Sequence, residues 1–74
     1  MTREEFVQSG GDQSRPATYG DQRAATDWAR TFSTWDDQTW CVVKGDGFFL
    51  AMSADRVEPW MGKVVAHYRR GGRA

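Results

Sequence analysis

The sequence predicts a small α+β domain: one helix packed on a small three-stranded antiparallel sheet, with disordered termini. Three observations support this fold class. Apolar side chains recur at helical spacing over residues 21–33. Two apolar runs, residues 39–44 and 48–53, flank a glycine-containing turn and read as a hairpin, because branched and aromatic side chains pack well on a pleated surface. Residues 63–69 form a third strand-like run.

The size of the chain limits how it can be stabilised. Its 74 residues are enough for one domain at most, and a core of this size supplies about 3–5 kcal/mol of net stability. One Cys and one His exclude an internal disulfide and make a structural zinc site very unfavourable. The four Trp, four Phe and two Tyr must therefore provide much of the core, since each ring buries roughly 150–250 Å².

The helix over residues 21–33 has a clear start and a clear apolar face. Asp21 is a good N-cap, because its carboxylate can accept from the free N–H groups of the first turn. Trp28 and Phe32 are one helical turn apart on the apolar face. We therefore expect these two rings to cover one face of the hairpin.

The turn of the hairpin leaves two strand registers open. A three-residue loop over residues 45–47 would place Val42 opposite Leu50, whereas a two-residue type I′ turn at residues 46–47 would place Val43 opposite Leu50. Both runs are apolar on both faces. The second face of the sheet therefore needs cover from the N-terminal arm, from the Trp-Met pair that precedes the third run, or from a partner.

The third run is expected to alternate regularly, with residues 64, 66 and 68 on one face and residues 65 and 67 on the other. The folded domain is predicted to comprise residues 21–69. Residues 1–20 are predicted to be a flexible arm and residues 70–74 a flexible basic tail, because both carry little apolar surface to offset the entropy of ordering.

Charge is balanced overall but not along the chain. Ten basic and ten acidic residues give a net charge of zero. Residues 1–55 hold five basic and nine acidic residues, a balance of −4, whereas residues 56–74 hold five basic residues and one acidic residue, a balance of +4. Such asymmetry indicates an electrostatic contact with a partner. No apolar run approaches the roughly 18 residues of a membrane span, and a lone cysteine fits the cytoplasm.

The sequence contains no convincing catalytic set. A nucleophilic Cys41 would need His67 as base and an acid such as Asp36 to converge on it, and their spacing gives no support for this. Residues 45–47 join two strands, whereas a phosphate-binding glycine loop opens into a helix. The turn carboxylates lack the ligand spacing of a calcium loop. The sequence therefore predicts no enzymatic activity, no metal and no cofactor.

Nucleic-acid binding is the alternative function. Arg69, Arg70 and Arg73 lie in a glycine-containing basic segment, with aromatic side chains such as Tyr68 nearby for stacking. About three to five phosphate contacts would give only weak binding at physiological salt. The chain as a whole is neutral, unlike the usual basic domain of this class.

Protein binding explains more of the composition. Trp, Tyr, Met and Arg are enriched at interfaces, and the Trp content exceeds what a small core needs. Eight Arg against two Lys, with no Ile or Asn, is typical of a GC-rich bacterial or phage genome. We therefore predict a monomeric, non-enzymatic regulator of phage or mobile-element type that docks on a larger bacterial complex, such as RNA polymerase, and inhibits or redirects it. The predicted partner-binding residues are Trp35, Trp60, Met61, Arg69, Arg70 and Arg73.

Overall fold

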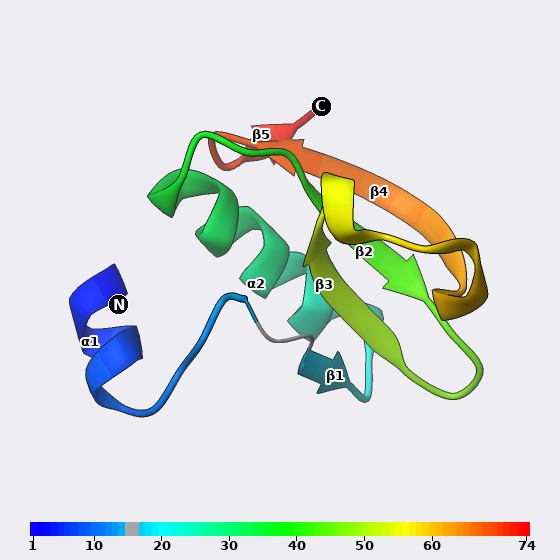
Figure 1. Ribbon diagram of the computed structural model, residues 1–74, viewed down its shortest axis with the longest axis horizontal. Helices are drawn as coiled ribbons and strands as arrows, with labels where there is room; N and C mark the ends of the chain where they lie inside the picture. Colours follow the sequence, from blue (N-terminus) through cyan, green and yellow to red (C-terminus); the bar gives the residue numbers. More distant parts are fainter. Residues whose placement is uncertain (15–16) are drawn as a thin grey trace.

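The computed structural model describes residues 1–14 and 17–74. The elements of this part of the chain are α1 (Arg3–Gln8), β1 (Ala17–Tyr19), α2 (Gln22–Trp35), β2 (Trp40–Lys44), β3 (Phe49–Ser53), the 3₁₀ turns η1 (Ala54–Arg56) and η2 (Pro59–Met61), β4 (Lys63–Arg69) and β5 (Gly72–Arg73). The strands form one antiparallel sheet in the order β1-β3-β2-β4-β5, and α2 lies along one face (Figure 1).

The predicted α+β class is confirmed, but the predicted number of three strands is wrong. The three predicted strands are β3, β2 and β4, and the short strands β1 and β5 extend the sheet at its two edges. A three-residue strand and a two-residue strand carry too little apolar pattern to be distinguished from loops in the sequence.

Helix α2 follows its prediction closely. The Asp21 carboxylate accepts from the backbone N–H of Ala24 at 2.8 Å, which satisfies one of the free donors of the first turn. Ala25, Ala29 and Phe32 are buried against the sheet. The helix ends at Trp35, two residues later than expected.

The hairpin of β2 and β3 adopts the second of the two predicted registers. Val43 lies opposite Leu50, so residues 46–47 form the two-residue turn. The expected type I′ geometry is absent from this turn. Gly47 has φ of +83°, but a type I′ turn also needs positive φ at Asp46, and Arg70 is the one non-glycine residue with positive φ in the described ranges.

A β-bulge in β4 overturns the predicted alternation. The β2–β4 ladder shifts register between Val42 and Val43, which leaves Val65 as the extra residue of β4. Ala66 and Tyr68 share one face, as expected, and this face lies under α2, but Val64 packs on the opposite face. The error arises because an alternating pattern contains no information about where one residue is inserted.

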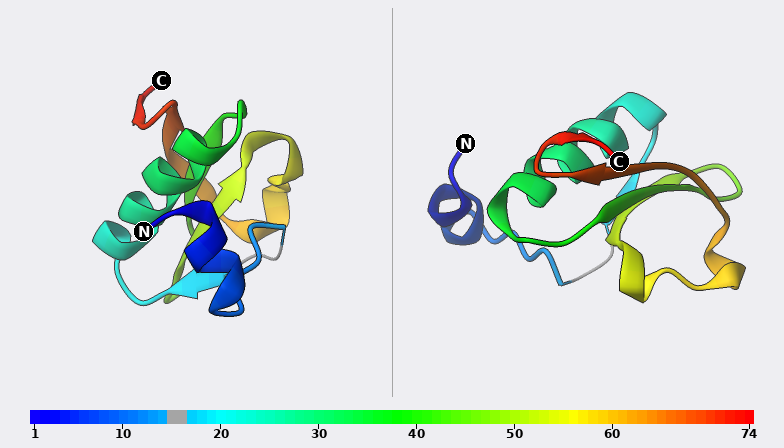
Figure 2. Two further views of the ribbon diagram at one scale, coloured as in Figure 1. Left: turned by 90° about the vertical axis from the view of Figure 1, so that its left-hand side faces the viewer. Right: turned by 90° about the horizontal axis from the view of Figure 1, so that it is seen from above.

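The sheet is covered on both faces. The cluster under α2 consists of Ala25, Ala29, Phe32, Trp40, Val42, Ala51, Ala66 and Tyr68. The second cluster contains Cys41, Val43, Leu50 and Met52, with Phe48, Val57, Met61 and Val64 packed against it. Residues 54–62 cross the sheet on the side opposite α2 (Figure 2), so Val57 and Met61 supply the cover that the hairpin requires.

Both chain ends contain regular elements. Helix α1 begins with a capping box, in which the Thr2 hydroxyl accepts from the Glu5 N–H and the Glu5 carboxylate accepts from the Thr2 N–H. Strands β4 and β5 are joined by Arg70 and Gly71, with φ of 54° and 79°, as a type I′ turn requires. The sequence predicts a flexible arm over residues 1–20 and a flexible tail over residues 70–74. The flexibility of these two segments in solution stays a prediction.

Candidate functional site

The six predicted partner-binding residues do not form one patch. Trp60 and Met61 precede the start of β4, whereas Arg69 and Arg70 lie at and just beyond its end and Arg73 lies in β5. The seven residues of β4 separate the two groups by roughly 20 Å. Figure 1 shows the segment before β4 and strand β5 at opposite ends of β4.

Trp60 is the most exposed large apolar side chain among the residues described, at 77%. It lies in η2, which begins at Pro59, and its indole N–H donates to the Glu58 carboxylate. Proline fits the first position of such a turn because its fixed φ matches and no N–H is lost. Met61, the next residue, packs into the second cluster. The turn is therefore anchored through Met61 while the Trp60 ring points to solvent.

Two lysines lie on the face of the sheet opposite to this turn. Lys44 and Lys63 are opposite each other in the β2–β4 ladder, and both are exposed. Lys44 also pairs with Phe49, which packs under α2, whereas residues 54–62 cross the other face of the sheet. We call Glu58 and Trp60 the Trp60 surface.

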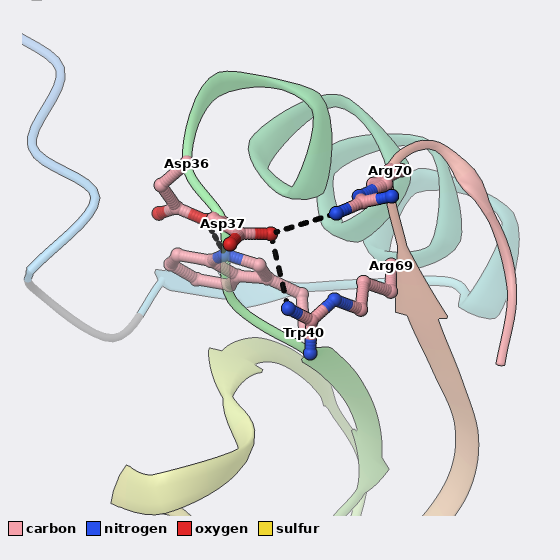
Figure 3. Close-up of polar contacts among 5 residues, drawn as sticks. All are labelled: Asp36, Asp37, Trp40, Arg69 and Arg70. Atoms are coloured by element: carbon pink, nitrogen blue, oxygen red, sulfur yellow. Dashed lines mark hydrogen bonds and ion pairs between the residues drawn. The ribbon is translucent and has the colours of Figure 1, made fainter.

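The arginines at the other end of β4 contact the fold itself. Arg69 Nη2 lies 3.0 Å from Asp37 Oδ1, and Arg70 Nη2 lies 3.7 Å from the same oxygen (Figure 3). The neighbouring Asp36 accepts from the Trp40 indole N–H at 2.9 Å. The two adjacent carboxylates thus connect the end of α2 to β2 and to the β4–β5 turn. These ion pairs are exposed and add little stability.

Trp35 lies away from the exposed surfaces. It is half-buried, and its ring centroid is 5.3 Å from that of Phe6 and 5.7 Å from that of Phe32. Trp35 and Trp60 both flank turns in the sequence, so local pattern could not separate them. The difference comes from Phe6, which is far away along the chain, and from Phe32, because both rings pack against Trp35.

Sequence reasoning also missed the position of the only Cys and the only His. Cys41 and His67 are opposite each other in the β2–β4 ladder. Cys41 is 1% exposed, and burial raises the pKa of its thiol, which disfavours the reactive thiolate. The geometry therefore brings the pair together without activating the sulfur. Only knowledge of the strand register would have revealed this proximity.

Burial of Cys41 predicts a loss of stability at alkaline pH. The folded chain holds the thiol proton above the ordinary pKa of 9.0, while the unfolded chain releases it. This contribution to stability is present below about pH 9 and is lost as the pH rises through the raised pKa. Urea unfolding of the wild-type chain and Cys41→Ala at pH 7.5, 9 and 10.5 measures it. The free energy of unfolding of the wild-type chain should fall relative to that of Cys41→Ala as the pH rises. A difference that does not change with pH would contradict the prediction.

The comparison of the wild-type chain with Cys41→Ala is needed because burial also raises the pKa of Tyr19. That tyrosine is common to both chains, so its effect cancels in the difference.

No group of three or more His, Cys, Asp or Glu side chains in residues 1–14 and 17–74 is placed to hold a metal ion.

The fold and these surfaces define a small α+β domain with an exposed tryptophan. No protein-family model, no curated protein and no solved structure matches the chain. Over the residues that the structure describes, no helix is both long enough and apolar enough to cross a membrane. The functional argument therefore depends on the geometry of the Trp60 surface and its surroundings.

Proposed function

We propose that the chain is a small, non-enzymatic protein-binding regulator that docks as a monomer on a larger bacterial protein or complex in the cytoplasm. The observation that supports this proposal is the exposure of Trp60 on an anchored turn. Exposing a ring of this size to water is unfavourable, and Trp is among the residues that contribute most to binding at interfaces. Because Met61 fixes the turn, the ring loses little freedom when it binds.

The surroundings of Trp60 favour an apolar pocket on the partner. The Glu58 carboxylate accepts from the Trp60 indole N–H, so the polar edge of the ring is already hydrogen-bonded and its exposed faces can enter such a pocket. The specific form of the proposal is a phage or mobile-element protein that inhibits or redirects a bacterial complex such as RNA polymerase. The small size of the chain and its GC-rich composition support that form.

The alternative, nucleic-acid binding through Arg69, Arg70 and Arg73, has less support. Asp37 contacts both Arg69 and Arg70, and Arg30 Nε donates to the Gly71 carbonyl at 3.1 Å. The Asp37 carboxylate offsets one of these positive charges, which reduces the attraction of the segment for phosphates.

Trp60→Ala tests the proposal. We expect it to weaken capture of the partner from bacterial lysate by at least roughly 30-fold, which corresponds to about 2 kcal/mol for a central interface tryptophan. Val7→Ala is the matched control, because Val7 is also an exposed apolar side chain, at 59%, but lies outside the Trp60 surface. Both variants should unfold within about 0.5 kcal/mol of the wild-type chain.

Undiminished capture by Trp60→Ala would overturn the assignment of this surface. Titration of labelled single-stranded and duplex nucleic acid at about 150 mM salt distinguishes the alternative, because tight and salt-dependent binding would favour it.

A further inference from the structure

Helix α1 is attached to the rest of the molecule mainly through one side chain. Phe6 is half-buried, whereas the other five residues of α1 are exposed. Its ring centroid lies 5.2 Å from that of Trp28, 5.4 Å from that of Phe32 and 5.3 Å from that of Trp35. Figure 1 shows α1 at the margin of the molecule, beside α2 and away from the sheet.

Two solvent-open hollows lie beside α1. A cleft of about 1010 Å³ is lined by Phe6, Gly11, Trp28 and Trp40, among others. A smaller hollow of about 470 Å³ is lined by Met1, Arg30 and Trp35, among others. Both hollows adjoin the contact between α1 and α2, so there is room beside α1 for a longer helix.

Helix α1 is also too short to be stable by itself. Its six residues are far below the length at which isolated helices form in water, so it depends on the capping box and on the docked ring. One buried ring offsets the ordering entropy of only a few residues. Release of α1 would expose the parts of Trp28, Phe32 and Trp35 that the Phe6 ring contacts.

We propose that α1 is an intramolecular pseudo-ligand, and that the surface formed by Trp28, Phe32 and Trp35 is a second docking site for an amphipathic helix of a partner protein. The occupant must carry one bulky aromatic side chain in the position of Phe6, because that ring defines what the three aromatic residues accept. A longer helix would also fill the hollows beside α1, which gives it an advantage over the tethered segment. This site is separate from the Trp60 surface.

A peptide of residues 1–11 is the probe for this site. It is titrated into the full-length chain that carries Phe6→Ala, whose own arm no longer competes, while the indole N–H resonances of the tryptophans are followed by NMR. The peptide should shift the resonances of Trp28 and Trp35 saturably and leave that of Trp60 unchanged. A peptide carrying Phe6→Ala is the control and should cause no saturable shift.

The wild-type chain provides the quantitative test. If its arm occupies the site nine-tenths of the time, the peptide should bind it about 10-fold more weakly than it binds the Phe6→Ala chain. Gly11→Ala is a second release variant, since its Cβ would lie 2.5 Å from the Phe6 ring. It replaces Phe6→Ala if that chain proves unfolded by circular dichroism. Equal shifts with both peptides, or no saturable shift in a folded release variant, would overturn the proposal.

Hydrogen exchange of the wild-type chain tests the release of α1 directly. The amides of α1 should exchange at least about 100-fold faster than the buried amides of α2, because releasing one ring requires no unfolding of the sheet. Equal protection of the two helices would show that α1 is an integral part of the core. A dimer of the wild-type chain in sedimentation that the peptide dissociates would make the occupant a second copy and would also contradict the proposal.

Discussion

Phe32→Ala is expected to leave much of the chain unfolded at 25 °C. Phe32 is 4% exposed, and its ring centroid lies between 4.9 and 5.7 Å from those of Phe6, Trp28, Trp35 and Trp40. Truncating a buried phenylalanine costs about 3–5 kcal/mol, because the transfer term and the cavity add. A domain of this size holds only about 3–5 kcal/mol in total, so this one change removes most of its stability.

Far-UV circular dichroism and tryptophan fluorescence across a urea gradient measure this loss. Phe32→Leu is the matched control, since it keeps most of the apolar volume and should cost about 1.5 kcal/mol or less. Cooperative unfolding of Phe32→Ala at the wild-type midpoint would show that the aromatic cluster is not the main source of stability. The result would then favour the second cluster, around Val43 and Leu50, as the stable part of the fold.

The elements predicted from the sequence are those with strong local patterns. The Asp21 cap and the apolar stripe of α2 are contained within 15 residues, and the β2–β3 hairpin lies around one short glycine turn, although two registers of that hairpin fit its sequence. The bulge at Val65 and the strand β5 depend on contacts between residues far apart in the chain. Positive φ at Arg70 is also uncommon for a non-glycine residue, so the sequence Arg70-Gly71 gives only a weak signal for a type I′ turn.

The candidate site was predictable to a similar extent. Trp60 could be proposed because it follows Pro59 in a turn, where side chains are often incompletely covered. The pairing of Lys44 with Lys63 could not be proposed, because it needs the shifted register that the bulge creates. The burial of Trp35 depends on Phe6, 29 positions earlier in the chain. Long-range packing therefore decides which of the tryptophans beside turns is available to a partner.

Gly62→Ala is the second change with a large expected effect. Gly62 has φ of 137° and ψ of −159°, a combination that is essentially restricted to glycine. A Cβ at this position would lie 2.2 Å from the Lys44 carbonyl oxygen and 2.8 Å from its carbonyl carbon. Both are backbone atoms that cannot move without disturbing β2. The strained dihedral costs about 1–3 kcal/mol and the overlap about 1–3 kcal/mol more, so we expect a loss of about 2–6 kcal/mol.

Gly20→Ala is the matched control, because a Cβ at Gly20 would meet no atom within 4 Å. Urea unfolding should place Gly20→Ala within about 0.5 kcal/mol of the wild-type chain and Gly62→Ala far below it. Equal stability of the two variants would mean that the Gly62 backbone relaxes freely. Since Gly62 joins the Trp60 turn to β4, such freedom would also remove the fixed presentation of Trp60 on which the proposed docking depends. Any Gly62→Ala chain that remains folded should therefore bind the partner more weakly than Gly20→Ala does.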